Sequence, residues 1–368
     1  MQIARCPFFL LLTRVLAING VNIMVHSSDL DAELVQESGI STEVDGLKSL
    51  GREIMSPTQR MDTIATSVGK KQQRVSASAS AIHVITQEDI RRSGVTSIPE
   101  ALRMVPGVQV ARIDSNKWAI SARGFNGMFA NKLLVLIDGR EVYNPTFAGV
   151  YWDIQDLALD DIDRIEVIRG PGASLWGANA VNGVINILTK PAQVTQGGSL
   201  TAGGGSYEQG FGSLRYGAKL GDRTYGRVYA KGLRRGSFNS LDKGDGNDDW
   251  SLTQTGFRLD REEQDGNRLM LEGGIALTRF NERFLKPSPL PPYNEFSPSS
   301  GRASGFNLLG RWSKALSLSS EFSLQGYYDH FHRTERLATQ ERDTLDLEAQ
   351  HRFLWGDWQD ITWGLGYP

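Results

Sequence analysis

The sequence predicts a compact α+β domain followed by the antiparallel strands of a transmembrane β-barrel. From about residue 75 to about residue 192, short apolar runs alternate with capped helical segments and turns, as in one small globular unit. After Pro191, segments of about ten residues alternate with Gly, Asp and Asn turns, and this length crosses a membrane as a tilted strand. The 40 glycines and 15 phenylalanines agree with this prediction, because glycine relaxes turns and aromatic residues favour half-buried strands.

The segment before the α+β domain is predicted to contain a signal peptide and a flexible arm. Within residues 1–26, Arg5 precedes the apolar run Pro7–Leu12, and Arg14 separates this run from a second one. Arg14 interrupts the pattern and no A-x-A cleavage site follows, so a disordered start is the alternative. Residues 27–74 are polar and show no sustained period, which predicts a flexible periplasmic arm.

The composition excludes several classes of function. With 40 Lys and Arg against 42 Asp and Glu, the chain has no basic field, and nucleic-acid binding is not expected. Cys6 is the only cysteine, which rules out an intrachain disulfide, a CxxC metal site and a thiol relay. No cofactor or metal site is expected, since chance placement explains His330 and His332 on one strand face better than metal binding does.

Two short helices are expected near the start of the α+β domain. Thr86, followed by Asp89, can cap the first helix, which Gly94 would close. The sequence Ser97-Ile98-Pro99-Glu100 is a capping box with proline in the first turn, and it starts a second helix that Pro106-Gly107 ends.

Apolar runs predict the strands of the same domain. They are Ile82–Ile85, Val108–Ile113, Leu133–Ile137, Ile162–Ile168 and Val184–Leu188. Asp138-Gly139 separates Leu133–Ile137 from the short run Glu141-Val142-Tyr143. This arrangement predicts a hairpin whose turn needs positive φ.

The segments after Pro191 alternate with a period of two, as the wall of a barrel requires. In Thr344–Phe353, one face carries Leu345, Leu347, Ala349 and Phe353, and the other carries Thr344, Asp346, Glu348, Gln350 and Arg352. Similar patterns around Leu269–Leu277 and Phe322–Tyr328 predict strands with lipid on one side and water on the other. Lys219–Asp222 reads as a tight turn and Asn281–Gly301 as a long polar loop, as expected for short periplasmic turns and long outer loops.

Three stretches of the α+β domain resemble the plug domain of TonB-dependent receptors. They are Arg123-Gly124-Phe125-Asn126-Gly127, Leu133–Tyr143 and Ile165–Ile187, and the resemblance runs without a gap from about Ser80 to Lys190. It implies a plug spanning 75–192 inside a barrel of about 22 strands, of which 193–368 would be the first part. It also implies a monomeric, non-enzymatic receptor of the Gram-negative outer membrane. Such receptors import scarce solutes, for example ferric siderophores or cobalamin, with energy from TonB.

A phosphate-binding loop is the competing interpretation of the glycine-rich run Gly170–Gly183. A Walker loop needs a lysine after its last glycine, and none follows Gly177. A dinucleotide loop needs a third glycine that the sequence after Gly172 does not place correctly. A backbone that turns sharply against a surrounding wall explains the glycines better.

The resemblance suggests three groups of functional residues. Plug arginines of the family pair with barrel acids, which points to Arg123 and Arg169 and their neighbours Gly124, Gly170 and Pro171, with exposed arginines as the alternative. The patch Asp62, Thr63, Ile64, Ala65 and Thr66 resembles the TonB box, which adds as a strand to TonB. By position, the candidates for contact with the solute are Asn116, Lys117, Trp118, Phe129, Tyr151 and Trp152, and packing in the core is the alternative for the aromatic ones.

Two other functions stay open, and the chain is expected to stop within the barrel. A signal-transducing receptor would carry a further N-terminal domain of about 80 residues, for which the arm is too short. A soluble α/β binding module would need a recognisable set of site residues.

About nine strands can be counted after Pro191 against about 22 in the family, so the C-terminus at 366–368 is expected to truncate the barrel. Because such a sheet leaves unpaired edges, the fragment alone is not expected to transport.

Overall fold

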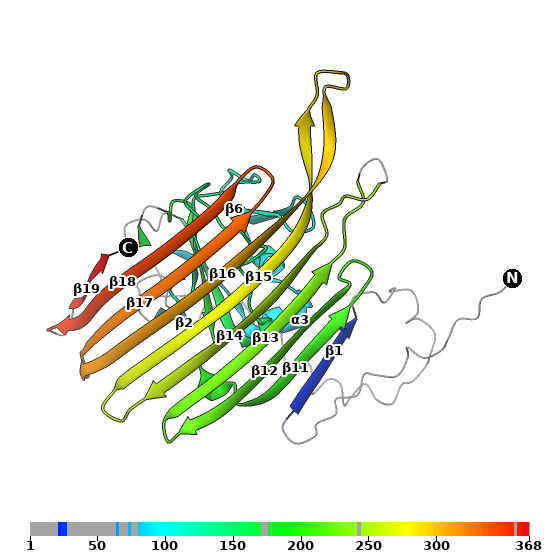
Figure 1. The fold of residues 1–368 in the computed structure, drawn as a ribbon. Coiled ribbons are helices and arrows are strands. Elements are labelled where there is room, and N and C mark those ends of the chain that lie inside the picture. The colour runs from blue at the N-terminus through cyan, green and yellow to red at the C-terminus, as the bar shows by residue number, and fades with distance from the viewer. Residues whose placement is uncertain are drawn as a thin grey trace, which may run out of the picture.

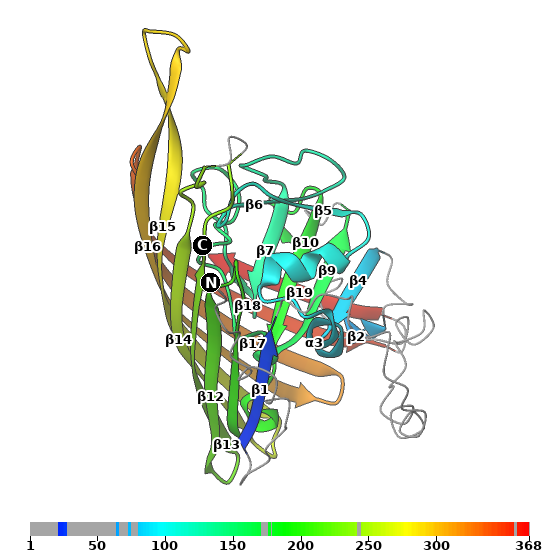
Figure 2. The ribbon, with the colours of Figure 1, turned by 90° about the vertical axis from the view of Figure 1, so that its right-hand side faces the viewer.

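The protein consists of a broad antiparallel sheet with an α+β domain on its concave side (Figures 1 and 2). The computed structural model describes residues 80–170, 176–177, 179–240, 244–356 and 359–367, and the backbone alone of 21–27, 64–65 and 73–74. No helix among these residues is long and apolar enough to cross a bilayer.

Nine consecutive strands form the broad sheet, here called the wall. They are β11 (Gly197–Gly204), β12 (Gly210–Gly221), β13 (Thr224–Arg235), β14 (Trp250–Glu262), β15 (Asn267–Pro287), β16 (Asn294–Ser317), β17 (Ser320–Thr334), β18 (Thr339–Trp355) and β19 (Gln359–Tyr367). Each strand pairs antiparallel with the next. A further strand, β1 (Val21–Ser27), lies parallel to β11 and is built mostly from the segment expected as a signal peptide. The described strands end at β1 and β19, so the sheet is not closed.

The two faces of the wall differ in polarity as the sequence predicts. On β15, Leu269, Ile275 and Leu277 are exposed on the convex face, whereas their neighbours Ala276 and Thr278 are buried on the concave face. Exposed apolar side chains continue across the convex face at Leu214, Val228, Leu308, Leu324, Leu345, Leu347 and Leu365. Buried polar side chains gather on the concave face at Arg227, Lys231, Arg235, Arg258, Asp329 and Arg333. This is the pattern of a barrel wall with an apolar exterior.

The two ends of the wall carry connections of different length. At one end, here called the short-turn end, residues 222–223 and 318–319 link neighbouring strands. At the other, the long-loop end, residues 236–249 link β13 to β14. The expected loop 281–301 is largely ordered: β15 and β16 continue as a ribbon that projects beyond the sheet, closed by residues 288–293 (Figure 1). The ribbon forms despite its polar, proline-rich sequence, because its two strands pair along their length. It is also supported by the Arg283 guanidinium, which lies 4.3 Å from the centroid of the Phe296 ring.

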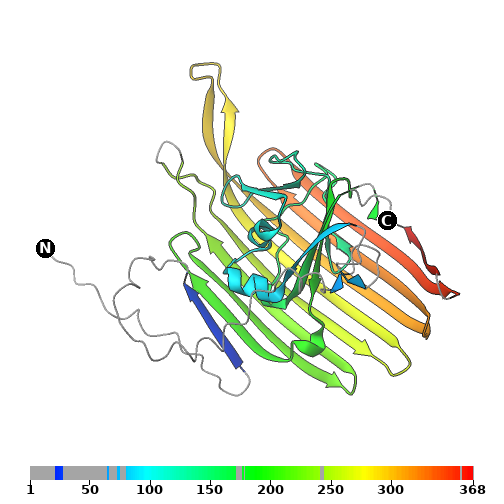
Figure 3. The same cartoon turned by 180° about the vertical axis from the view of Figure 1, so that it is seen from behind.

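The α+β domain is built on a five-stranded mixed sheet that lies across the concave side of the wall (Figure 3). The strand order is β4 (Ala81–Thr86), β9 (Ile162–Arg169), β10 (Gly183–Thr189), β7 (Leu133–Ile137) and β8 (Arg140–Glu141). Beside it lie the pair β5 (Val108–Arg112) and β6 (Trp118–Ala122), helices α3 (Gln87–Ser93) and α4 (Ile98–Ala101), and the 3-10 turns η2 (Leu102–Met104), η3 (Leu159–Asp161) and η4 (Ala192–Val194). The five strands expected in this domain are confirmed.

Local signals explain two of these elements. Thr86 accepts from the Asp89 amide, and the Asp89 carboxylate accepts from the Thr86 amide, so the expected cap at Thr86 is confirmed and forms a complete capping box. The left-handed Gly94 cap at the other end of α3 is confirmed as well. The turn between β7 and β8 also forms as predicted. Asp138 has φ 49° and Gly139 has φ 95°, which a hairpin turn of this type requires.

The capping box expected at Ser97 is wrong. Helix α4 does begin after Ser97 with Pro99 in its first turn, but the Ser97 side chain makes no capping bond. The Glu100 carboxylate instead accepts from Arg103 Nε at 2.5 Å and from Trp118 Nε1 at 3.0 Å. These two stronger donors hold it away from the start of the helix.

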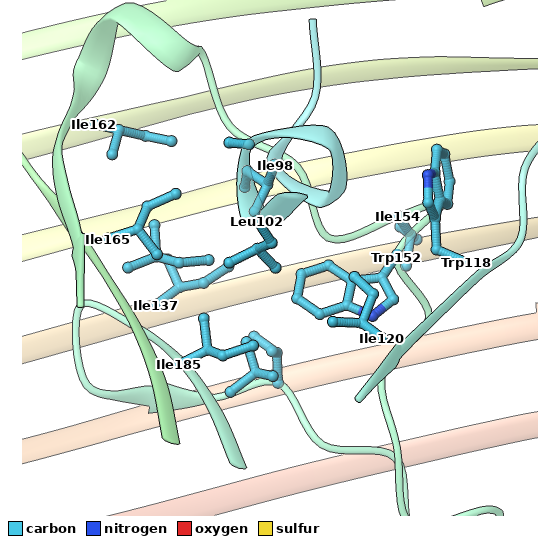
Figure 4. Close-up of a cluster of buried hydrophobic side chains, with 14 of the residues drawn as sticks. Ile98, Leu102, Trp118, Ile120, Ile137, Trp152, Ile154, Ile162, Ile165 and Ile185 are labelled. Carbon is cyan, nitrogen blue, oxygen red and sulfur yellow. The ribbon is translucent and has the colours of Figure 1, made fainter. Parts of the chain in front are cut away.

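The core of the domain, part of which is drawn in Figure 4, continues into the wall. Ile98 and Leu102 pack against Ile165 and Ile185 of the mixed sheet, and the same cluster extends to β6 and to wall residues Leu252, Phe280 and Phe331. Strand β6 was not expected from the sequence, because all five of its residues are buried and show no period of two. Domain and wall therefore share one hydrophobic cluster.

Candidate functional site

Acidic side chains of the α+β domain meet basic side chains of the wall. Arg333 Nη1 lies 2.7 Å from Asp153 Oδ2, and Lys231 Nζ lies 2.5 Å from Asp156 Oδ2. Towards the short-turn end, Arg215 Nη1 lies 2.5 Å from Asp161 Oδ1. Both partners of the first two pairs are less than a tenth exposed. In such surroundings each charge depends on its partner, because an unpaired buried charge is strongly unfavourable.

Two contacts have the opposite polarity. Arg140 of β8 donates to Asp329 Oδ1 at 2.7 Å, and Arg342 of the wall donates to Asp329 Oδ2 at 2.6 Å. The carboxylate of Asp329 is thus held between one cation of the domain and one of the wall. Lys117 Nζ lies 2.9 Å from Asp114 Oδ2 in its own loop and 3.2 Å from Glu282 Oε2 on β15.

The charge of Lys117 is stabilised by this pair of acids. Burial works against the ammonium form, but the attraction and hydrogen bonds of Asp114 and Glu282 outweigh it, so the pKa of Lys117 lies above its ordinary value. Lys117 remains a cation that bridges a loop of the domain to the base of the projecting ribbon.

An aromatic and basic cluster fixes the same loop at the long-loop end. The Arg112 guanidinium lies about 5 Å from each of three ring centroids, those of Trp118, Tyr207 and Phe238. Tyr207 donates to Ser115 Oγ at 2.7 Å and accepts from Arg112 Nη2 at 2.7 Å. The loop 113–117 is therefore held between two connections of the wall rather than lying free in solvent.

The six candidates for solute contact do not form one exposed surface. Phe129 is exposed, whereas Lys117 and Tyr151 are half-buried. Asn116, Trp118 and Trp152 are buried, and both tryptophans belong to the hydrophobic core, which agrees with the packing alternative for them. All six lie towards the long-loop end, and their contact with a solute stays a prediction.

The described bonds of the two predicted plug arginines lie within the domain. Arg123 Nη2 donates to the Arg169 carbonyl at 3.2 Å, and Arg169 Nη1 donates to the Pro106 carbonyl at 2.7 Å. Gly124 and Gly170 both adopt positive φ, and Pro171 lies outside the described residues. A barrel acid as partner of either arginine stays a prediction.

The predicted TonB box is described only in part. Ile64 and Ala65 form the two-residue strand β2 (Ile64–Ala65), which pairs antiparallel with β3 (Gln73–Arg74). Asp62, Thr63 and Thr66 lie outside the described residues.

The ion-pairing residues at the interface were missed by sequence reasoning. The wall cations Arg227, Lys231 and Arg235 lie at every fourth position of β13 and so share its concave face, and the acids Asp153 and Asp156 follow closely after Trp152. A period-two search for charges as well as for apolar residues could have found the first set.

A sequence profile described as "TonB-dependent Receptor Plug Domain" matches residues 74–184. This segment is a TonB-dependent receptor plug domain. With the plug on the concave side of an antiparallel wall, the chain has the architecture of a TonB-dependent outer-membrane receptor whose barrel is partial.

Relatives and solved structures agree with this family. The vitamin B12 transporter BtuB of Vibrio cholerae serotype O1 is 31% identical over 165 residues, which cover 45% of this chain and 26% of that protein. BtuB of Photobacterium profundum is 33% identical over 173 residues, covering 46% and 27%. This match spans about a quarter of each curated relative.

Among solved structures, the ferric yersiniabactin uptake receptor FyuA from Yersinia pestis superposes with a TM-score of 0.63 at 17% identity. The match covers 79% of this chain and 48% of that one. The closed form of the ferric-catecholate import receptor Fiu from E. coli K12 gives a TM-score of 0.62 at 14% identity, covering 83% and 48%. At these identities the structures support the fold of plug and wall. These relatives and neighbours are named as transporters and receptors rather than enzymes.

Proposed function

We propose that this protein is an outer-membrane receptor that takes up a scarce solute, such as a ferric siderophore or cobalamin, with energy from TonB. The observation that carries the proposal is the buried, ion-paired interface between plug and wall. The plug shares an apolar cluster with the wall, and buried charge pairs such as Lys231–Asp156 add polar contacts to the same interface. The charges of these pairs regain hydration when the plug moves, which offsets part of the free energy lost when the pairs separate.

The long-loop end is proposed to face the outside of the cell and the short-turn end the periplasm. Transmembrane β-barrels of the outer membrane have short periplasmic turns and longer outer loops, which supports this orientation. The solute would then contact the plug loops around Lys117, Phe129 and Tyr151. The arm with Ile64 would reach the periplasm.

In this mechanism the protein catalyses no reaction. Solute binding changes the contacts of the plug loops, the segment around Ile64 becomes available, and TonB pairs with it as an added strand. Strand addition relies on main-chain hydrogen bonds, so it requires an extended backbone with free amide groups.

Uptake by the natural gene product tests the proposal. In a host without receptors of its own, uptake of a radiolabelled ferric siderophore or of cyanocobalamin should require both this protein and TonB. Ile64→Pro should abolish uptake while leaving solute binding unchanged, because proline removes an amide donor from the added strand. Ile64→Val, which keeps that donor, is the matched control. Equal uptake with and without TonB would refute the proposal.

A further inference from the structure

Three arginines form one row across the convex face of the wall, near the long-loop end. Arg234 on β13 is opposite Ser251 on β14, Ser251 is opposite Arg279 on β15, and Arg279 is opposite Arg302 on β16. All three arginines are exposed, whereas the residues next to them in sequence on the concave side, Leu233, Phe280 and Ala303, are buried. The row therefore points away from the plug and from every ion pair of the plug–wall interface.

These guanidiniums lack acidic partners within the described part of the chain. Arg279 and Arg302 are directly opposite each other, and like charges in such a pair are destabilising unless a counter-charge is present. The arginines line an open hollow of about 550 Å³, to which Ser251 and Thr334 add hydroxyl groups. Asp249 is the only carboxylate among the described lining residues, and it accepts from Asn281 Nδ2 at 2.8 Å. The hollow thus has an excess of positive charge.

The row lies at one edge of the apolar band of the wall. Below Arg279 on the same face of β15 follow Leu277, Ile275, Leu271 and Leu269. Ten residues of strand correspond to roughly 34 Å along the chain and, at the tilt of barrel strands, to about 25 Å across the membrane. Because this is about the height of the apolar band of such barrels, the arginines fall at a membrane interface. There an arginine on the lipid face costs only about 0–1 kcal/mol, against about 2–4 kcal/mol at the midplane.

We propose that the row of Arg234, Arg279 and Arg302 binds the phosphate groups of a lipid headgroup in the outer leaflet. The inference rests on the proposed placement in the outer membrane. Guanidinium groups bind phosphate through paired, charge-assisted hydrogen bonds. Arg279 and Arg302 lie on neighbouring strands about 5 Å apart, so they can share one phosphate. Arg234 lies two strands from Arg279, about 10 Å away, and can reach a second phosphate. This spacing favours a lipid with more than one phosphate.

Binding of bis-phosphorylated lipid A to the full chain in detergent tests the proposal, with native mass spectrometry as the readout. The double variant Arg279→Gln/Arg302→Gln should weaken lipid A binding roughly tenfold or more, since each charge-assisted hydrogen bond to phosphate contributes substantially to the free energy of binding. The matched control is Arg261→Gln/Lys314→Gln, which removes two cations from the same face at the short-turn end. The control should bind lipid A like the unaltered protein. Circular dichroism establishes that each variant is folded.

Three results would overturn the proposal. They are unchanged binding by the Arg279/Arg302 variant, equal weakening in the control, and full competition by inorganic phosphate, which would assign the hollow to a free anion. Zwitterionic phosphatidylethanolamine should bind both variants and the unaltered protein alike. Solute uptake measured on the same variants separates the two proposals. Lipid binding can be lost while TonB-dependent uptake remains, and TonB-dependent uptake can be absent while lipid binding remains.

Discussion

Arg333 on wall strand β17 donates from Nη1 to Asp153 Oδ2 of the plug at 2.7 Å, although 180 positions separate the two residues in the sequence. The side chains are 2% and 4% exposed. The guanidinium also lies 4.2 Å from the Tyr151 ring centroid and 4.3 Å from that of Phe280, so charge pairing and aromatic packing converge on one wall residue. This contact couples the loop that carries Tyr151 to the wall.

Arg333→Gln should therefore lower the free energy of unfolding by about 3–5 kcal/mol, because it leaves Asp153 buried without its partner. Urea unfolding of the full chain in detergent, followed by tryptophan fluorescence, measures the change. Arg352→Gln is the control: its ion pair with Asp360 is partly exposed, and such pairs contribute about 0–1 kcal/mol. Equal losses in the two variants would contradict the role given to Arg333.

Gly139→Ala should destabilise the plug by about 1 kcal/mol or more. Gly139 has φ 95°, and an added Cβ would lie 2.6 Å from Arg311 Nη2 and 2.8 Å from Gln325 Oε1 of the wall. The control is Gly127→Ala, since nothing lies within 4 Å of a Cβ at that position. Thermal unfolding of the two variants should separate them, and a Gly139 variant as stable as the Gly127 variant would be inconsistent with this turn.

Glu141 and Glu100 should give opposite pH dependences of stability. Burial raises the pKa of Glu141 above its ordinary value of 4.5, so the folded state favours the protonated acid and loses stability as the pH rises above 4.5. Glu141→Gln should remove this loss and raise stability at neutral pH.

For Glu100, burial opposes ionisation, but hydrogen bonds from Arg103 and Trp118 outweigh it and the pKa is lowered. This stabilisation is present above 4.5 and is lost as the pH falls through the lowered folded-state value, so Glu100→Gln should reduce stability at neutral pH. Unfolding free energies measured from acid to neutral pH test both signs. A shift of the same sign in both variants would exclude this assignment.

Phe129→Ala and Trp118→Ala should separate solute contact from packing. Phe129 is 60% exposed, so its loss should weaken solute binding several-fold with little effect on unfolding. Trp118 is 5% exposed within the core, and its loss should cost about 3–5 kcal/mol of stability. Solute titration and chemical unfolding of both variants provide the measurements. Unchanged affinity in the Phe129 variant would remove it from the proposed solute surface.

Solute should also change the accessibility of the arm. Trypsin cleavage at Arg60 and Lys70, on either side of the TonB-box-like segment, should become faster when the correct solute is added to the purified receptor. A solute that the receptor does not bind is the control. Identical cleavage rates with both solutes would contradict ligand-dependent release of the arm.

Much of the architecture was predictable because it depends on short-range signals. Thr86 and Asp89 cap α3 from three residues apart, and Asp138-Gly139 sets its own turn. The alternation along Thr344–Phe353 defines two faces of β18 without knowledge of its neighbours. Strand β6 escaped prediction because its uniformly buried residues have no such period.

The sequence by itself determined the order of plug and wall, the positions of most strands, and which face of each wall strand is apolar, because these follow from spacing along the chain. Only the tertiary structure decided which charges meet across the plug–wall interface, and it placed Arg234, Arg279 and Arg302 in one cross-strand row. Ion pairs and cross-strand rows join residues that are distant in sequence, and their partners follow from strand register and from how the plug lies against the wall. The local pattern fixes the elements, whereas long-range packing selects the contacts between them.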